Sequence, residues 1–282
     1  MIKTVMLMTL MTLLLMMLGQ FFGGLEGMTF MLLFGVAMNL YYYWNSADMV
    51  LRQYQAREIT EANAPELFGI VKKLAKKAEI PMPKIYVIPE NVPNAFATGR
   101  DPEHAVVAVN SGLVDLLDRD EVEGVLAHEI SHIAHRDILI STISACMANT
   151  ITTVAHWGAY LGGGDNDRDR NPIVTILVFL LAPIAAAMLQ MSISRSREYM
   201  ADELGGEISG KPDALADALL KIESYARRVT MRRATETTAH MFIINPFSGK
   251  DVKTLFSTHP STEERVKLLR EQARKLKAGK GK

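Results

Sequence analysis

The sequence contains a single cysteine, Cys146, among 282 residues, so no internal disulfide can form. Because this cysteine lies in an apolar segment, we expect a small buried side chain rather than a reactive thiol. A net charge is also missing, since 31 basic and 31 acidic side chains cancel. This balance, together with the lack of a basic patch interleaved with aromatic residues, argues against nucleic acid as a partner.

Charged residues are absent from four long apolar runs, at 4–22, 28–44, 138–161 and 173–193. Each is close to the roughly 20 residues that a helix needs to cross a bilayer. The first run is longer than the apolar core of a signal peptide, and no small-residue cleavage site follows it, so we expect a span. The third run carries many hydroxyl and amide side chains. It either crosses the bilayer or lies partly outside the lipid, and we expect it to cross.

Cations near the ends of these runs orient the chain by the positive-inside rule. Arg52, Arg57, Arg136, Arg195 and Arg197 lie on one side, whereas the short opposite loop carries two arginines. We therefore predict a multi-pass protein of the cell (inner) membrane whose amino terminus and catalytic domain are cytoplasmic. The predicted domains are an amino-terminal transmembrane hairpin (1–44), a second transmembrane hairpin (138–193), and a cytoplasmic domain assembled from 45–137 and 194–282.

The cytoplasmic part is predicted to be mainly helical, with a small antiparallel β-sheet. Asp120 and Glu123 match a capping box, and the absence of glycine and proline from 125 to 157 favours one continuous helix into the third run. Ser261 and Glu264 match a second capping box. The other predicted helices cover 65–79, 111–117 and 212–229, and the predicted strands cover 84–88, 94–98 and 105–109. The fold class is thus an α-helical membrane protein with an α+β cytoplasmic domain.

The pattern that carries chemistry is His128-Glu129-Ile130-Ser131-His132. On a helix, positions i and i+4 share one face, so both imidazoles can bind one metal ion, and the glutamate between them is placed to take a proton from water. Three protein ligands and one open position are typical of a catalytic zinc site. We therefore predict one Zn²⁺ per chain, bound in part by His128 and His132, with Glu129 as the general base.

The third ligand has to come from elsewhere, because the position six residues after His132 is Ile138. Glu198 follows the fourth run directly, and antiparallel packing of the third and fourth runs would bring it opposite the two histidines. The alternative is a surface glutamate paired with Arg195 or Arg197. Asp202 lies one turn further on. It is predicted to accept the second ring N–H of a zinc histidine, unless it is an ordinary surface aspartate.

Four motifs occur in a fixed order around the four apolar runs: N-A-F-A-T-G, H-E-I-S-H, R-E-Y-M-A-D and H-P-S-T-E-E-R. With them the chain resembles the HtpX-type membrane metallopeptidases, which belong with the CAAX prenyl endopeptidases among the glutamate zincins. The resemblance implies a zincin-like domain with His128, His132 and Glu198 as zinc ligands and Glu129 as the base.

The same resemblance implies two further roles. Asn94, Ala95 and Phe96 would lie on an edge strand that binds the substrate backbone as an added strand; a plain structural strand is the alternative. His259 and Arg265 would stabilise the oxyanion of the tetrahedral intermediate; a cap motif at the start of the last helix is the alternative, and both can hold.

The predicted function is a membrane-embedded zinc endopeptidase that cleaves cytoplasmic segments of membrane proteins. The resemblance implies misfolded or damaged membrane proteins as substrates, and hence a role in protein quality control and the stress response. The lipid bilayer and unfolded polypeptides are the expected partners, and the sequence does not specify an oligomeric state. A non-catalytic zinc-binding scaffold or holdase is the rival interpretation, although such a protein would not need Glu129. A metal transporter is disfavoured because the four runs contain no charged residue.

Overall fold

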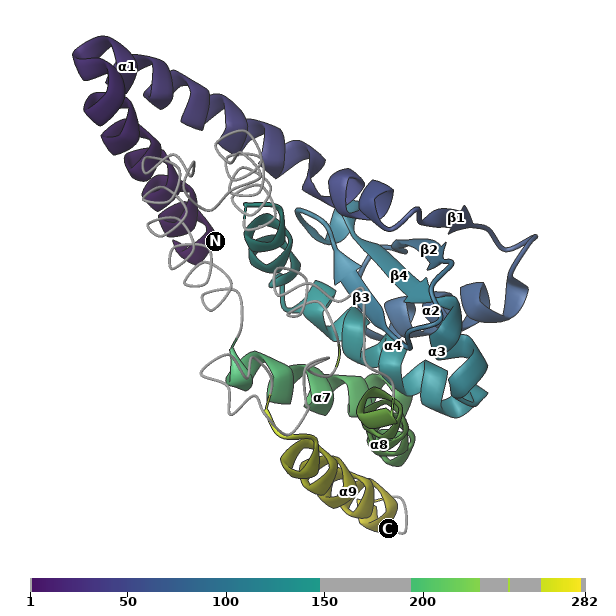
Figure 1. Ribbon diagram of the computed structural model, residues 1–282. Helices are drawn as coiled ribbons and strands as arrows, with labels where there is room; N and C mark the ends of the chain where they lie inside the picture. Colours follow the sequence, from purple (N-terminus) through teal and green to yellow (C-terminus); the bar gives the residue numbers. More distant parts are fainter. Residues whose placement is uncertain (1, 148–193, 229–242, 244–259, 280–282) are drawn as a thin grey trace.

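The computed structural model describes residues 2–147, 194–228, 243 and 260–279. The predicted loop 162–172, the fourth span 173–193, most of the third span and His259 lie outside these residues. The domain boundaries given above therefore remain a prediction. In the described part, a membrane-type helical hairpin adjoins a domain of helices around a small sheet (Figure 1).

The hairpin is built by α1 (Ile2–Gln53), which is broken at Gly23 and at Gly24, whose φ is 58°. The two arms contain apolar stretches long enough to span a bilayer, Thr4–Phe21 and Gly23–Gln53, where the sequence predicted the spans 4–22 and 28–44. The arms approach so closely at Gly19 that a β-carbon there would collide with the backbone of Gly27. Figure 1 shows the hairpin extending away from the sheet.

The sheet contains β1 (Arg57–Ile59), β2 (Lys84–Ile88), β3 (Ala95–Thr98) and β4 (Val106–Asn110), in the order β1-β2-β4-β3. The prediction of a purely antiparallel sheet was wrong, because β2 and β4 run parallel. The reason is that β4, buried at all five positions, takes the place between β2 and β3. Since β3 pairs antiparallel with β4, it lies at one edge of the mixed sheet formed by the described residues.

The two faces of the sheet are covered differently. Val107 and Val109 of β4 pack in a core with α2 (Pro65–Lys77) and α4 (Arg119–Ala134). Val106 and Ala108, which alternate with them, pack in a second cluster with residues of α1 and of the helix Ile138–Met147. The sheet therefore lies between the helical core of the domain and the apolar helices.

Two predictions about α4 were wrong. Its capping box is formed by Asp118 and Glu121, two residues before the predicted Asp120 and Glu123. The helix also does not continue into the third apolar run. It ends at Ala134, and Arg136 takes a left-handed backbone with φ 57° before a new helix begins. No glycine or proline marks this break, so pattern alone could not reveal it.

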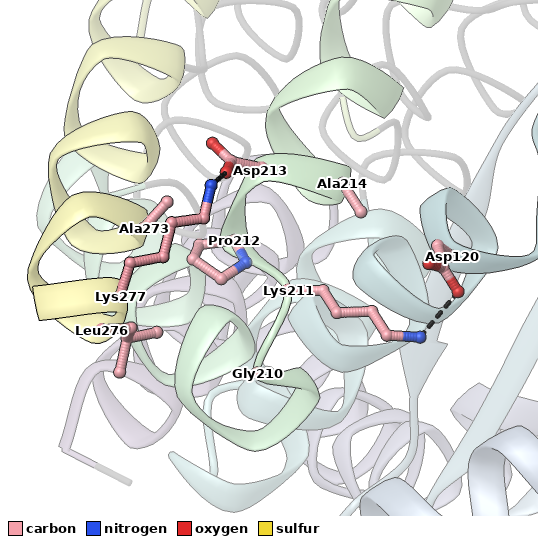
Figure 2. A pocket seen from close by; sticks show the side chains of 9 residues that line it. All are labelled: Asp120, Gly210, Lys211, Pro212, Asp213, Ala214, Ala273, Leu276 and Lys277. Carbon is pink, nitrogen blue, oxygen red and sulfur yellow. Dashed lines mark hydrogen bonds and ion pairs between the residues drawn. The ribbon is translucent and has the colours of Figure 1, made fainter. Parts of the chain in front are cut away.

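The other helices among the described residues are η1 (Pro102–His104), α3 (Ser111–Leu116), α7 (Arg195–Ser209), α8 (Pro212–Arg228) and α9 (Thr262–Gly279). Of the capping box predicted at the start of α9, the bond from the backbone N–H of Glu264 to Ser261 Oγ is present, at 3.3 Å. Ion pairs hold α8 and α9 together: Asp213 pairs with Arg270 and Lys277 at 2.9 Å each, beside a cavity where Lys211 reaches Asp120 (Figure 2).

Candidate metal centre and active site

The site forms where α4 packs against α7. Gly205 makes this close packing possible, because a β-carbon there would lie 3.0 Å from the backbone nitrogen of His128. Glu198 lies in the first turn of α7, and His128 lies in the buried middle of α4. The approach of the two helices therefore sets the distance between the imidazoles and the carboxylate of Glu198.

The described residues contain one group of three side chains arranged to hold a metal ion: His128, His132 and Glu198. The two Nε2 atoms are 3.2 Å apart. The Glu198 oxygens lie 3.7 Å from His128 Nε2 and 3.8 Å from His132 Nε2. Donors on a tetrahedral zinc ion with bonds near 2.05 Å are separated by about 3.3 Å. Both the donor set and its spacing thus fit zinc, with one position left open for a water or substrate oxygen.

Each histidine is held at its second nitrogen by a carboxylate. His128 Nδ1 lies 2.9 Å from Asp202 Oδ1. His132 Nδ1 lies 3.2 Å from both oxygens of Asp137. Such a bond favours the tautomer with the proton on Nδ1, which leaves the Nε2 lone pair directed at the metal position.

The electrostatics of the two histidines differ. Burial lowers the pKa of His128, and the nearby Arg265 and His132 lower it further. Asp202 raises this pKa, but its effect is smaller, so the pKa is lowered overall. Burial also lowers the pKa of His132, but the carboxylates of Asp137, Glu198 and Glu129 outweigh burial and raise it to about 9. His132 therefore has to release a proton when a metal binds.

Glu129 is buried on α4 beside the ligand group. Burial raises the pKa of its carboxyl to about 7, and the neighbouring Glu198 adds to this rise. One carboxylate oxygen accepts a hydrogen bond of 2.9 Å from the backbone N–H of Ala97 on β3. A carboxyl that titrates near neutral pH and is held by a rigid strand suits a general base.

Arg265 is 1% exposed and lies behind His128 rather than in front of it. Its Nε and Nη2 atoms donate to the two oxygens of Asp202 over 2.7 Å each, and Nη1 donates to the backbone oxygen of Ile243 over 2.8 Å. Nη2 is 3.4 Å from His128 Nδ1, on the ring edge away from the metal position. Arg265 therefore contacts the ligand group through Asp202 and His128.

The residues of the predicted substrate strand are buried. The side-chain oxygen of Asn94 accepts a hydrogen bond from the N–H of Ile243, and its backbone oxygen accepts one from Asn110. Ala95 is fully buried, and Phe96 packs against Tyr54 in the cluster with the apolar helices. In this register the N–H and C=O of Ala95 and Ala97 point away from β4. Ala97 is the one residue of β3 that is not fully buried.

Two contacts of the site were not foreseen from the sequence. Asp137 was missed because a continuous helix was expected there, and a helix would carry residue i+5 away from the face of His132. Ala97 was missed because it acts through its backbone N–H, which leaves no trace in residue type. The neighbouring His135 is exposed at the carboxyl end of α4 and is not one of the three grouped side chains.

The chain is similar over nearly its whole length to known proteins. The model of "Peptidase family M48" matches residues 61–273. A "Protease HtpX homolog" of Burkholderia mallei (strain SAVP1) is 52% identical over 276 residues, 97% of each chain. A second "Protease HtpX homolog", of Desulfatibacillum aliphaticivorans, is 51% identical over 95% of this chain and 88% of that protein.

A solved structure shares the fold. The crystal structure of S. mikatae Ste24p aligns with a TM-score of 0.53 and 20% identity, and the alignment covers 95% of this chain and 65% of that chain. At this identity the likeness concerns the arrangement of helices and sheet alone.

Proposed function

Because the chain belongs to peptidase family M48 and is a metalloprotease of a membrane-associated kind, we propose that it is a zinc endopeptidase whose active site lies at the crossing of α4 and α7. The observation that supports this most directly is the placement of Glu129. Its carboxylate lies beside three donors spaced for one zinc ion, and it is held by the edge strand.

In this proposal His128, His132 and Glu198 hold one Zn²⁺, which would polarise the scissile carbonyl and make the attacking water more acidic. Glu129 accepts the proton of that water and returns it to the leaving amine. Asp202 and Arg265 keep His128 oriented from behind. The role of His259 in stabilising the oxyanion remains a prediction, and the position of Arg265 favours an indirect contribution over direct contact with the oxyanion.

The substrate would be an extended polypeptide that adds to the edge of β3. The outward C=O of Ala97 offers a backbone acceptor beside Glu129, while the N–H of Ala97 is already used by that carboxylate. Ala95 is fully buried, so a substrate strand could pair with it only if the covering residues moved. We therefore place the main backbone contact at Ala97, with Asn94, Ala95 and Phe96 forming the strand that supports it.

The membrane setting suggests which polypeptides are cleaved. The cluster that packs one face of the sheet includes residues of both α1 arms and of the helix Ile138–Met147, so the site would lie close to the cytoplasmic surface of the bilayer. We propose cytoplasmic segments of misfolded or damaged membrane proteins as substrates, and protein quality control under stress as the role.

The test compares wild type with Glu129→Gln, using Glu103→Gln at an exposed position as the matched control. The detergent-purified proteins are analysed for bound zinc and for cleavage of casein. We expect all three to bind one zinc per chain, and Glu129→Gln to cleave about 10²- to 10⁴-fold more slowly. If Glu129→Gln cleaves casein as fast as the wild-type protein, the base is misassigned. If the wild-type protein binds polypeptide but does not cleave it, the result favours a holdase.

A further inference from the structure

His132, the second proposed ligand, is hydrogen-bonded by a residue that belongs to neither α4 nor α7. Asp137 lies three residues beyond the last residue of α4, and both of its carboxylate oxygens are 3.2 Å from His132 Nδ1. The contact is largely shielded from water, since the side chain of His132 is 17% exposed and that of Asp137 is 11% exposed. Screening by solvent is therefore weak, and the hydrogen bond is directional.

The backbone is shaped to make this contact. Arg136 adopts φ 57°, a conformation that costs a non-glycine residue roughly 1–2 kcal/mol. The turn allows the N–H of Asp137 to donate to the carbonyl of His132 over 3.3 Å. In a continuing helix that N–H would have bonded to Ile133 instead. The chain thus folds back at the point where the carboxylate can meet the imidazole.

The far side of Asp137 is anchored as well. The next helix starts at Ile138, which is buried in the domain core. One turn later Thr142 hydrogen-bonds Thr98 of β3 over 2.9 Å, and Ile143 is buried in the cluster with α1. Asp137 is therefore fixed between α4 and an apolar helix, and its carboxylate has little freedom to leave His132.

We propose that Asp137 is a positioning residue for the metal: it holds His132 in the tautomer and orientation that bind zinc, and so raises zinc affinity. This rests on the proposed role of His132 as a ligand. The pair would act in parallel with Asp202 and His128, where the carboxylate is in turn held by Arg265. The carboxylate of Asp137 accepts a hydrogen bond from Nδ1–H, which leaves the Nε2 lone pair facing His128 Nε2 and Glu198.

The experiment measures the zinc dissociation constant of the full-length protein in detergent, by competition with a chromophoric chelator. Wild type is compared with Asp137→Ala, Asp137→Asn, His132→Ala, and Asp115→Asn as an exposed control. We expect Asp137→Ala to bind zinc about 10- to 100-fold more weakly. Asp137→Asn should fall between, because its amide oxygen still accepts a hydrogen bond but carries no charge. Asp115→Asn should match wild type.

The melting temperature of each metal-free protein is measured alongside, to separate affinity from folding. Weakened zinc binding by Asp137→Asn with an unchanged metal-free melting temperature supports positioning. Unchanged affinity in both Asp137 variants overturns the inference, as does an affinity loss that only tracks unfolding. If wild type binds no zinc, or His132→Ala binds it as tightly as wild type, the proposed metal site itself fails, and this result is distinct from failure of the Asp137 inference.

Discussion

The pair of Arg265 and Asp202 offers a sharp test of how the site is held together. Arg265 is almost wholly buried, and two of its nitrogens bond the two oxygens of Asp202 at 2.7 Å. Replacing Arg265 by methionine keeps much of the side-chain volume and removes the charge. The carboxylate of Asp202 then remains buried beside His128 without its cation.

The size of the effect follows from the burial of both partners. Breaking a buried ion pair by removing one partner destabilises a protein by about 3–5 kcal/mol, because the other charge is left uncompensated. For a chain of this size, each kcal/mol corresponds to a melting-temperature shift of roughly 2–4 °C. We therefore expect Arg265→Met to melt roughly 6–20 °C below wild type at pH 8, in the metal-free state.

The deficit should depend on pH with a definite sign. In wild type, burial raises the pKa of Asp202, but Arg265 and His128 outweigh burial and hold it below its usual range. This stabilisation is present above the unfolded-state pKa of about 3.9 and is lost as pH falls through the lower folded-state pKa. Without Arg265, burial dominates and raises the folded-state pKa. The folded variant then gains protons, so its stability declines as pH rises, and the deficit should be smaller at pH 5 than at pH 8.

The assay is thermal unfolding in detergent with a chelator present, at both pH values. The double variant Arg265→Met/Asp202→Asn is the control, because it removes the stranded charge while keeping a hydrogen-bonding group beside His128. It should recover most of the lost stability. A deficit that is equal at both pH values and persists in the double variant would refute the charge argument and assign the effect to packing.

Three further predictions concern the same region. Gly205→Ala should lower the melting temperature by an amount equivalent to about 1–3 kcal/mol and weaken zinc binding, because its β-carbon would press on the backbone of His128. The control Gly69→Ala, in an open helical position, should raise the melting temperature slightly. Equal melting temperatures of the two variants would contradict close packing as the cause. Arg136→Gly should stabilise the metal-free protein by about 0.5–1 kcal/mol by relieving its left-handed backbone, as read from chemical unfolding; destabilisation would mean that the Arg136 side chain contributes more than the strain costs. Chelation should abolish casein cleavage and lower the melting temperature, and added zinc should restore both; a melting temperature indifferent to zinc would argue against binding by the folded state.

Much of the local structure was predictable from residue pattern. Pro212 opens α8, the apolar run 84–88 is β2, and the two apolar arms of α1 are separated by glycines. The spacing of His128 and His132 by four residues puts them on one helical face, and the structure brings Glu198 to them. Their binding of zinc remains a proposal.

Two of the errors, the helix break and the strand pairing, share a physical cause, since both depended on contacts outside the segment concerned. The break after Ala134 contains no glycine or proline. It is stabilised by the hydrogen bond between Asp137 and His132 and by the burial of Ile138 in the core. The parallel pairing of β2 and β4 reflects the choice of the most apolar strand for the centre of the sheet. Neither preference can be read from the segment in which it appears.

The strand β3 has its outer edge toward Glu129, through the N–H of Ala97, and one face toward the apolar helices, through Phe96 and the bond between Thr98 and Thr142. If the apolar helices span the bilayer as proposed, the site of cleavage would lie at a fixed distance from the membrane surface. A peptide bond buried in the bilayer would then not reach the site, whereas an unfolded tail or loop outside the bilayer would. Such an enzyme would select substrates by the length of unfolded chain that they expose outside the bilayer, and it would not cleave a tightly folded protein in the same membrane.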